Sequence, residues 1–383
     1  MTTILDAARR LRPTIAARAQ EIETARRLPA DLAAEMAAAG LFRMGLPREI
    51  GGPECDPATL LEAIEIIGDA DASAGWCTMI AVTSGLTAAY LETDVARAIF
   101  SPAHVIAGGV FAPMGRAVEN DDCFMLTGKW QWASGSANCH WLGGGALIVD
   151  EGAVRTSADG APKARMLLFP ASSATLIDSW HVAGLCGTGS GEMAVTNLRV
   201  PKSHSASIAT DRPVARGALY AFPIFGLLAL GIAAVMLGNA GAAIRDLVEL
   251  AGGKKPQGST RLLAERATAQ ATLAETVAKF RAARAFYYEA VDRAWRSART
   301  NGEVLLDERV ALRLAATHAV RTSAEATRAM CDLGGGSSVF LSSPLQRRFR
   351  DAFVGAQHMM IAPQTYELTG RALMGLKTDA GFL

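Results

Sequence analysis

The sequence predicts an α+β protein in which a β domain lies between two helical regions. Residues 1–103 are rich in Ala, Leu, Glu and Arg, and their apolar residues recur three and four positions apart. Residues 104–216 gain Val, Thr, Trp and Phe, with Gly and Pro at turns, which is typical of strands. Residues 217–383 return to the helical period. We therefore expect an N-terminal helical domain, a central β domain and a C-terminal helical bundle with these bounds.

Individual elements follow from the same patterns, taken in chain order. Apolar positions across residues 28–39 mark one face of a helix, and the glycines at 51–52 mark a turn. Alternating runs at residues 123–127 and 194–200 predict strands of the β domain. Two long amphipathic helices, at residues 262–296 and 308–330, are expected in the C-terminal region.

One apolar stretch allows two interpretations. Residues 221–244 contain no charged side chain and are long enough to cross a bilayer. Gly226, Gly231, Gly238 and Gly241 favour close helix packing, and no aromatic belt flanks both ends. We therefore expect a helix buried on all sides within a bundle, and no membrane partner.

Charge and cysteine usage narrow the classes of function. The 383 residues include 38 basic and 37 acidic side chains, without a long run of one sign, so we expect no nucleic-acid partner. The six cysteines form no CxxC, and the first ten residues lack an apolar leader core, which favours a reduced cytoplasmic protein. The six histidines show no metal-ligand spacing, and we expect no metal site.

Two segments have residues suited to hold a flat aromatic cofactor with phosphates. In residues 128–136 the aromatic side chains of Trp130 and Trp132 would share a strand face, and Ser134 can hydrogen-bond a ring atom; packing against helices is the alternative. Successive amides at Gly334, Gly335 and Gly336 can hold a phosphate, unless they form a plain helix connection. The glycines of residues 184–191 do not form a dinucleotide fingerprint, because no helix pattern follows them.

The C-terminal end has the most informative order of residues. The three glycines are followed by Arg350-Asp351, six further residues and then the pair His358-Met359. This order resembles the acyl-CoA dehydrogenase superfamily, in which the pair is often Tyr-Glu and the Glu removes the substrate's α-proton. A thioether cannot abstract a proton, so Met359 excludes that base. A His in the preceding position resembles the two-component flavin monooxygenases, the oxygen-using branch of the superfamily.

The resemblance extends over essentially the whole chain and implies both fold and activity. It implies an N-terminal helical domain, a central β-barrel domain and a C-terminal four-helix bundle, assembled as a homotetramer. It implies the oxygenase component of a monooxygenase that hydroxylates a small aromatic substrate, of the phenol or indole type, through a C4a-hydroperoxyflavin formed with O2. Reduced FMN or FAD would arrive from a separate NAD(P)H:flavin reductase.

The resemblance also implies roles for particular residues. His358 would be the catalytic residue, hydrogen-bonding the flavin–oxygen adduct or polarising the substrate. The flavin would be held by Trp132, Ser134, the three glycines at 334–336 and Gln270, with Lys254, Lys255 or Arg261 as the nearby cation. The substrate pocket would include Trp76, Gly109, Phe111 and Met359. Relatives often carry a Ser on the strand where this chain has Gly108 and Gly109, so these two positions offer no side-chain hydroxyl to a substrate.

Other functions remain open from the sequence. An acyl-CoA dehydrogenase with its base elsewhere is one, although residues 220–226 hold no acid and Glu367 lies eight residues too late. An N- or S-oxidising monooxygenase of the same fold is another. A flavin-free binding relative is the third, and flavin uptake separates it from the enzymes.

Overall fold

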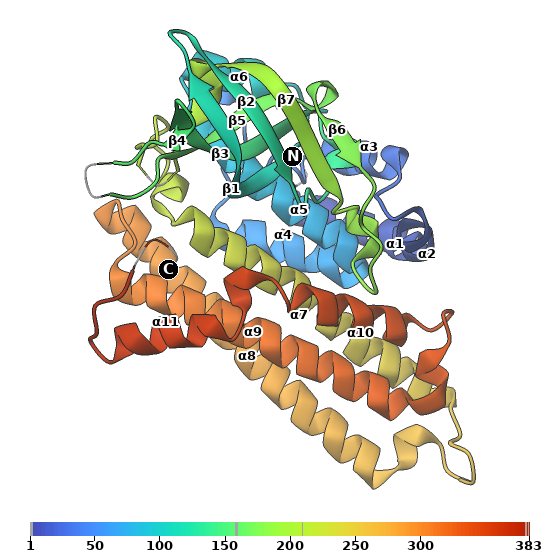
Figure 1. Cartoon of the computed structure of the whole chain (residues 1–383). Coiled ribbons are helices and arrows are strands. Elements are labelled where there is room, and N and C mark those ends of the chain that lie inside the picture. The colour runs from blue at the N-terminus through green and yellow to red at the C-terminus, as the bar shows by residue number, and fades with distance from the viewer. Residues whose placement is uncertain (1–2, 158–159, 209, 380, 382) are drawn as a thin grey trace.

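The computed structural model describes residues 3–157, 160–208, 210–379, 381 and 383, and it consists of a β body flanked by helices (Figure 1). The chain begins with helices, continues through strands and ends with helices. The N-terminal helices are α1 (Ile4–Ala17), α2 (Ala19–Ala25), α3 (Ala30–Ala38), α4 (Pro57–Ala70), α5 (Ala72–Gly85) and α6 (Thr93–Phe100). Asp56 and Asp71 cap α4 and α5, since each carboxylate accepts a hydrogen bond from a backbone N–H in the first turn.

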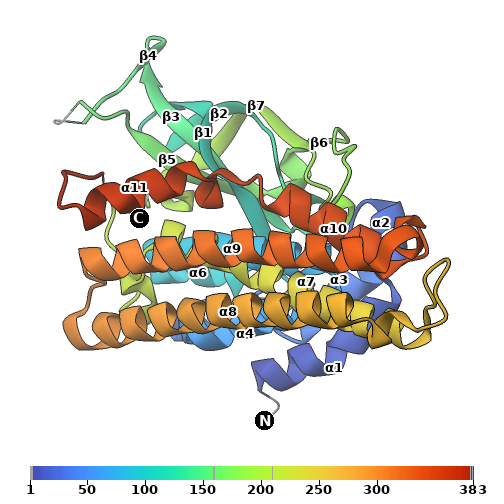
Figure 2. The same ribbon diagram turned by 90° about the horizontal axis from the view of Figure 1, so that it is seen from below.

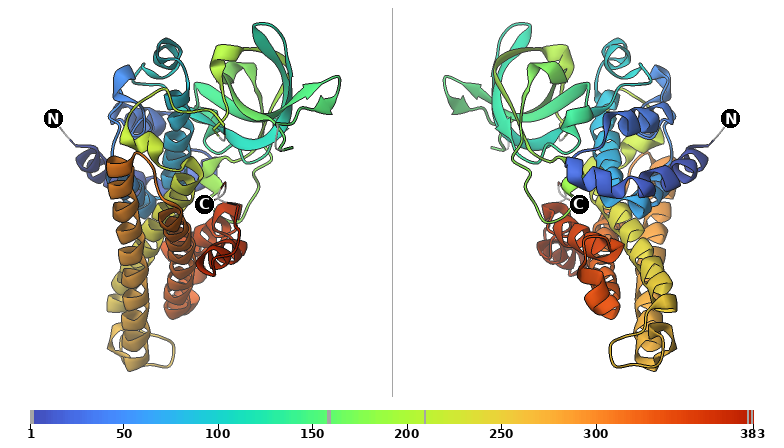
Figure 3. Two further views of the ribbon diagram at one scale, coloured as in Figure 1. Left: turned by 90° about the vertical axis from the view of Figure 1, so that its left-hand side faces the viewer. Right: turned by 90° about the vertical axis from the view of Figure 1, so that its right-hand side faces the viewer.

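Eight strands form one sheet that curls around its own core (Figure 3). The strand order is β6-β7-β2-β1-β3-β5-β8, with β4 paired to β3. Neighbours are antiparallel except β1 and β3, which run parallel. The expected strands at 123–127 and 194–200 are confirmed within β2 and β7. The bounds are β1 (Ala107–Glu119), β2 (Cys123–Trp130), β3 (Trp141–Asp150), β4 (Ala153–Val154), β5 (Ala164–Pro170), β6 (Thr175–Ile177), β7 (Glu192–Pro201) and β8 (Ser205–Ala206).

The C-terminal helices form a bundle in which α8 and α9 lie side by side (Figure 2). The two long helices expected from periodicity are present as α8 and α9. The last helix of this C-terminal region, α11, packs on α9. The bounds are α7 (Ile224–Gly253), α8 (Ala267–Asn301), α9 (Leu306–Gly334), α10 (Pro344–Gly355) and α11 (Gln364–Leu373). The α+β class and its three-part order are therefore confirmed.

Helix α7 is the apolar stretch that allowed two interpretations. It is long and apolar enough to span a membrane, but 89% of its most apolar window is buried inside the protein, against α4, α5, α9 and α10. Gly238 permits the close approach of α4, because an added Cβ would overlap the Glu65 carbonyl oxygen. The interpretation as a core helix of the bundle is confirmed.

Helix α5 links the two halves of the molecule. It contacts α7 on one side, and β1 and the loop before β7 on the other. All but one of its 14 residues are buried. Side chains on α5 therefore lie where the sheet meets the bundle.

Candidate active site

His358 lies directly after α10, before a short turn at Met359–Ile361. Its Nδ1 accepts a hydrogen bond from the Met360 N–H at 3.2 Å. Burial, and then the positive charge of Arg313, lower the pKa of His358 to about 4. The ring is therefore neutral near pH 7, and because Nδ1 is the acceptor, the proton sits on Nε2. His358 can offer a ligand a hydrogen-bond donor at Nε2 without changing its charge.

One aromatic ring contacts this imidazole, and an aromatic pair is linked to it through Arg313. Trp76 of α5 is buried, and its ring centroid lies 5.8 Å from that of His358. Phe111 of β1 packs edge-on against Phe225 of α7 at 6.1 Å. The buried Arg313 joins these groups, since it donates to the Met360 carbonyl at 2.6 Å and to the Phe225 carbonyl at 3.5 Å.

Of the expected pocket residues, Trp76 and Phe111 are linked through His358, Arg313 and Phe225, whereas Met359 and Gly109 are placed differently. Met359, beside the imidazole, is 69% exposed and carries no acid–base group. Gly109 is buried in β1, where an added Cβ would overlap the carbonyl oxygen of Gly143 on β3. The close approach of two parallel strands explains this glycine, and its place in a substrate pocket stays a prediction.

The two tryptophans of residues 128–136 do not share a face, so that expectation is wrong. Strand β2 ends at Trp130, whose side chain is fully buried in the sheet core and donates from Nε1 to the Gly145 carbonyl at 2.8 Å. Trp132 lies in the following loop with a φ of 62° and is 60% exposed. Alternation applies only inside a strand, and the positive φ rotates Trp132 out of register.

Ser134 belongs to a buried row of hydroxyl groups that joins two loops. Its Oγ lies 2.6 Å from Ser190 Oγ, and Ser190 Oγ lies 2.6 Å from Thr188 Oγ1. Thr188 Oγ1 donates to the Leu185 carbonyl at 2.7 Å. The backbone supports the same pairing, since the Gly135 N–H donates to the Thr188 carbonyl at 2.8 Å. The loop after β2 and the loop before β7 therefore form one rigid unit.

Asp351 ties this unit to the bundle. Its Oδ1 accepts a hydrogen bond from the Leu185 N–H at 2.6 Å, and Arg350 donates to the Ala183 carbonyl at 2.6 Å. Burial, and then the charge of Asp71, raise the pKa of Asp351 to about 7. The Arg-Asp pair of the sequence motif thus holds the loop before β7 against α10.

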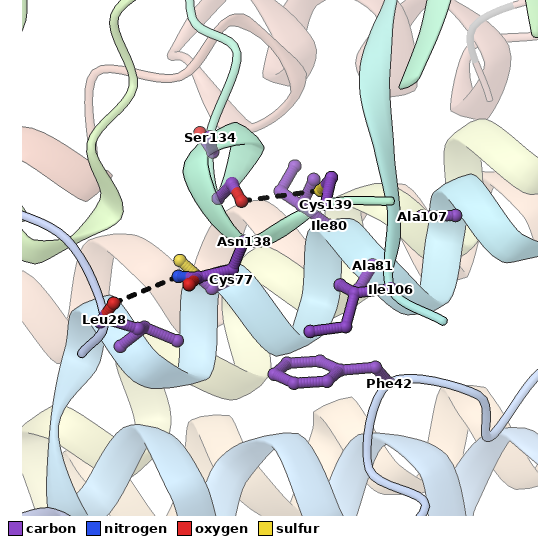
Figure 4. Close-up of a pocket in the computed structure, with 11 residues that line it drawn as sticks. Leu28, Phe42, Cys77, Ile80, Ala81, Ile106, Ala107, Ser134, Asn138 and Cys139 are labelled. Atoms are coloured by element: carbon purple, nitrogen blue, oxygen red, sulfur yellow. Dashed lines mark hydrogen bonds between the residues drawn. The ribbon is translucent and has the colours of Figure 1, made fainter. Parts of the chain in front are cut away.

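A small cavity lies behind the Ser134 loop (Figure 4). Its volume is about 10 Å³, enough for one water molecule and too small for an aromatic ring. Cys77 and Cys139 line it, and burial raises the pKa of both thiols, which keeps them protonated. This cavity is therefore packing space behind the loop and not the substrate site. Its lining is Leu28, Phe42, Cys77, Ile80, Ala81, Ile106, Ala107, Ser134, Gly135, Asn138 and Cys139.

The three glycines at the end of α9 lie before α10, at its end away from His358. Gly335 has a φ of 51°, and no atom lies within 4 Å of an added Cβ on Gly336. Lys254 Nζ donates to the Gly334 carbonyl and, at 2.8 Å, to Ser337 Oγ. Gln270 is exposed on the first turn of α8, where it donates to the Ala264 carbonyl at 2.9 Å.

One chain therefore does not bring all the expected flavin residues together. The 12 residues of α10 separate the glycines from His358, a span of about 18 Å for a helix of that length. Sequence reasoning also missed Thr188, Ser190 and Arg313. The first two lie in a glycine run that the sequence marks only as a loop between strands, and Arg313 lies within α9 with no pattern around it. Among Lys254, Lys255 and Arg261, it is Lys254 that reaches the glycines.

Comparisons with known proteins decide the family. Residues 2–94 match the family model "Acyl-CoA dehydrogenase, N-terminal domain", and residues 230–363 match "Acyl-CoA dehydrogenase, C-terminal domain". An indole-3-acetate monooxygenase of Pseudomonas putida is 33% identical over 368 residues, covering 96% of this chain and 92% of the relative. The chain belongs to the acyl-CoA dehydrogenase superfamily, in its two-component flavin monooxygenase branch.

Two other members of the superfamily support this placement. The oxygenase component of an FADH2-dependent resorcinol hydroxylase from Rhizobium sp. (strain MTP-10005) is 30% identical over 377 residues, covering 94% of this chain and 91% of the relative. The crystal structure of the HsaA monooxygenase from M. tuberculosis superposes with a TM-score of 0.90 at 25% identity and covers 99% of both chains. The resemblance read from the C-terminal motif is thus confirmed over the whole chain.

Proposed function

We propose that this chain is the oxygenase component of a two-component monooxygenase that uses reduced flavin and O2 to hydroxylate a small aromatic substrate of the phenol or indole type. The observation that carries the proposal is the neutral His358, with its donor at Nε2, packed against Trp76. Met359 occupies the position of the dehydrogenase base, and Glu367 is exposed on α11. The names of the relatives support an aromatic substrate and a separate partner component.

The residues present fit a flavin at two places. Gly336 has no atom within 4 Å of an added Cβ, while the Gly335 N–H donates to the Asp332 carbonyl. Lys254 uses two of its three N–H groups on the protein, which leaves one for a phosphate. Trp132 offers an exposed ring for stacking, and Ser134 offers a hydroxyl oxygen. Gln270, near the glycines, is a further candidate contact. FMN and FAD share this ring and its first phosphate, so both remain in the proposal.

Each protein group has a definite task in the proposed reaction. Reduced flavin, when bound, supplies the two electrons that allow one atom of O2 to enter the substrate while the other leaves as water. His358 holds its proton at Nε2 and donates a hydrogen bond to an oxygen atom in the site. Trp76 and Phe111 present apolar rings that exclude water and orient a flat substrate. Arg313 ties the backbone at Met360, two residues after His358, to that at Phe225 on α7 by donating to both carbonyls.

The proposal includes a cytoplasmic homotetramer served by an NAD(P)H:flavin reductase. Val339, Phe340 and Leu341 follow the glycines and are 72%, 65% and 74% exposed, a contiguous apolar tip that another subunit would cover. Such packing would bring the glycines of one subunit toward the flavin ring of the next. Sedimentation or light scattering of the purified protein measures the assembly, and a monodisperse monomer contradicts this part.

The activity is tested by oxygen transfer. Protein and reduced FMN or FAD are mixed with isotopically labelled O2 and with indole, indole-3-acetate or resorcinol. We expect a hydroxylated product carrying one labelled atom, with little hydrogen peroxide. Recovery of all electrons as peroxide with every compound contradicts the proposal. Bleaching of bound oxidised flavin by an acyl-CoA thioester would instead indicate a dehydrogenase.

A further inference from the structure

The row of hydroxyl groups behind the proposed flavin site has a direction. It ends at the Leu185 carbonyl, which can only accept hydrogen bonds. Thr188 has one hydroxyl proton, and it must point at that carbonyl to make the 2.7 Å contact. Thr188 Oγ1 can then only accept from Ser190, and Ser190, its proton used, can only accept from Ser134. Because three hydroxyl protons must make three hydrogen bonds that end at a carbonyl, the row has a single possible arrangement of donors and acceptors.

The surroundings prevent this arrangement from reversing. Thr188, Ser190 and Ser134 are 1%, 5% and 5% exposed, so water does not compete for their protons. Leu185 has a left-handed φ of 51°, which is unfavourable for a residue with a branched side chain. Hydrogen bonds hold it there: Asp351 accepts from its N–H, and Trp180 Nε1 donates to its carbonyl at 3.0 Å. The acceptor end of the row is thus fixed from the bundle side.

The consequence concerns Ser134. Its only hydroxyl proton is committed to Ser190, so toward any ligand Ser134 Oγ offers lone pairs alone. A flavin presents different groups in its two redox states: ring nitrogen N5 carries a hydrogen only when the flavin is reduced, and it is a bare acceptor when oxidised. An acceptor facing N–H makes a hydrogen bond, whereas an acceptor facing a bare nitrogen leaves both lone pairs unsatisfied.

We propose that the hydroxyl row from Leu185 through Thr188 and Ser190 makes Ser134 an obligate acceptor, and that this selects reduced over oxidised flavin. The inference rests on the proposed function, because it assumes that a flavin ring binds with N5 facing Ser134 Oγ. Thr188 and Ser190 are positioning residues that act through Ser134. Such selection suits an oxygenase that receives its flavin already reduced and must release it oxidised.

The test measures binding in both redox states, without substrate. Dissociation constants for oxidised and reduced FMN and FAD are determined anaerobically, together with the potential of the bound flavin. For Ser190→Ala we expect oxidised flavin to bind about tenfold tighter, because Ser134 recovers a proton to donate, while reduced flavin binds as before. A tenfold change in that ratio lowers the potential of a two-electron carrier by about 30 mV.

Four more variants separate the direction of the hydrogen bonds from packing. Thr188→Val keeps the shape of the side chain and does not touch Ser134, yet it releases the proton of Ser190 and should give the same shift. Ser134→Ala should instead weaken reduced flavin about tenfold and leave oxidised flavin unchanged. Ser190→Thr restores the hydroxyl and should restore the native ratio. Thr327→Val is the matched control, because this buried hydroxyl donates to a backbone carbonyl within α9.

The outcomes distinguish this inference from the proposed function. Native protein that binds neither redox state of either flavin overturns the proposed function, and the inference with it. Native protein that binds flavin, but with a ratio that Ser190→Ala and Thr188→Val leave unchanged, overturns the inference alone. A shift in Thr327→Val equal to that in Thr188→Val would also overturn it, since the effect would then be general destabilisation.

Discussion

The two glycine-rich segments of this chain, residues 184–191 and 334–336, are similar in sequence and opposite in structure. In the first, glycines are needed because other atoms are too close: an added Cβ on Gly184 would overlap the Arg350 carbonyl oxygen, and one on Gly187 would overlap the Ile22 side chain. In the second, an added Cβ on Gly334 would overlap Ser338 Oγ, whereas Gly336 has open space around it. Glycine therefore serves packing in the first segment and at Gly334, and access at Gly336, and only the surroundings tell which.

We expect the greatest change in stability at Asp351, which anchors residues 184–191 by accepting a hydrogen bond from the Leu185 N–H. The pKa of Asp351 is raised to about 7, so the folded protein binds a proton that the unfolded chain releases near pH 4. Stability from this group is present below pH 4 and is lost as the pH rises to 7. In Asp351→Asn, which keeps an acceptor for Leu185, we expect stability relative to the native protein to rise by up to about 4 kcal/mol between pH 4 and 8. Urea unfolding across pH measures it.

The same substitution at an exposed aspartate tests whether the pH-dependent gain in stability comes from the burial of Asp351. Asp94→Asn alters an exposed carboxylate on α6. An equal pH-dependent gain in this control would contradict the role given to Asp351, as would a constant difference between Asp351→Asn and the native protein.

The contrast between the two segments can be broken directly by adding one methyl group to each. Gly184→Ala forces the loop away from α10, and we expect a loss of about 3 kcal/mol in the free energy of unfolding. Gly336→Ala should change it by less than about 0.5 kcal/mol while weakening flavin binding. Thermal unfolding and flavin titration of both variants give the answer. Equal destabilisation by the two changes would remove the distinction.

His358, between α10 and α11, should affect chemistry and not binding. Replacement by Asn removes the Nε2–H donor, and we expect product formation to fall about a hundredfold, with hydrogen peroxide released instead. Flavin affinity should persist. Because the pKa of His358 is lowered to about 4, the imidazole contribution to native activity should not change between pH 8 and 6. Product formation at the native rate in the variant would make His358 a packing residue.

The smallest effect concerns the open segment and its cation. Lys254→Met removes the Nζ that bridges Gly334 and Ser337, and we expect about a tenfold loss of flavin affinity. Because salt screens the charge of Lys254, this difference between the native protein and the variant should shrink as the salt concentration rises. Lys255→Met, at the exposed neighbouring position, is the control and should bind flavin as the native protein does. Loss of affinity in both variants would indicate a general charge effect and not a phosphate site.

The order of helices and strands, the core character of α7 and the family could all be predicted from the sequence. These follow from local periodicity and from the spacing of a few residues near the C-terminus, and neither depends on distant contacts. His358 was located in the same way. The protonation state of His358 could not be predicted in this way, because its pKa depends on burial and on Arg313, which lies 45 residues away in the sequence.

The directions of the hydroxyl groups and the space around each glycine depend on contacts between distant parts of the chain. Ser134 meets Ser190 across 56 residues, and Leu185 meets Asp351 across 166. The end of β2 at Trp130 likewise placed Trp132 outside the strand, against the alternation expected from its spacing. Periodicity describes one face of one element. The direction of a hydrogen bond is set by the group at the far end of the chain of contacts, and here that group is a backbone carbonyl in another loop.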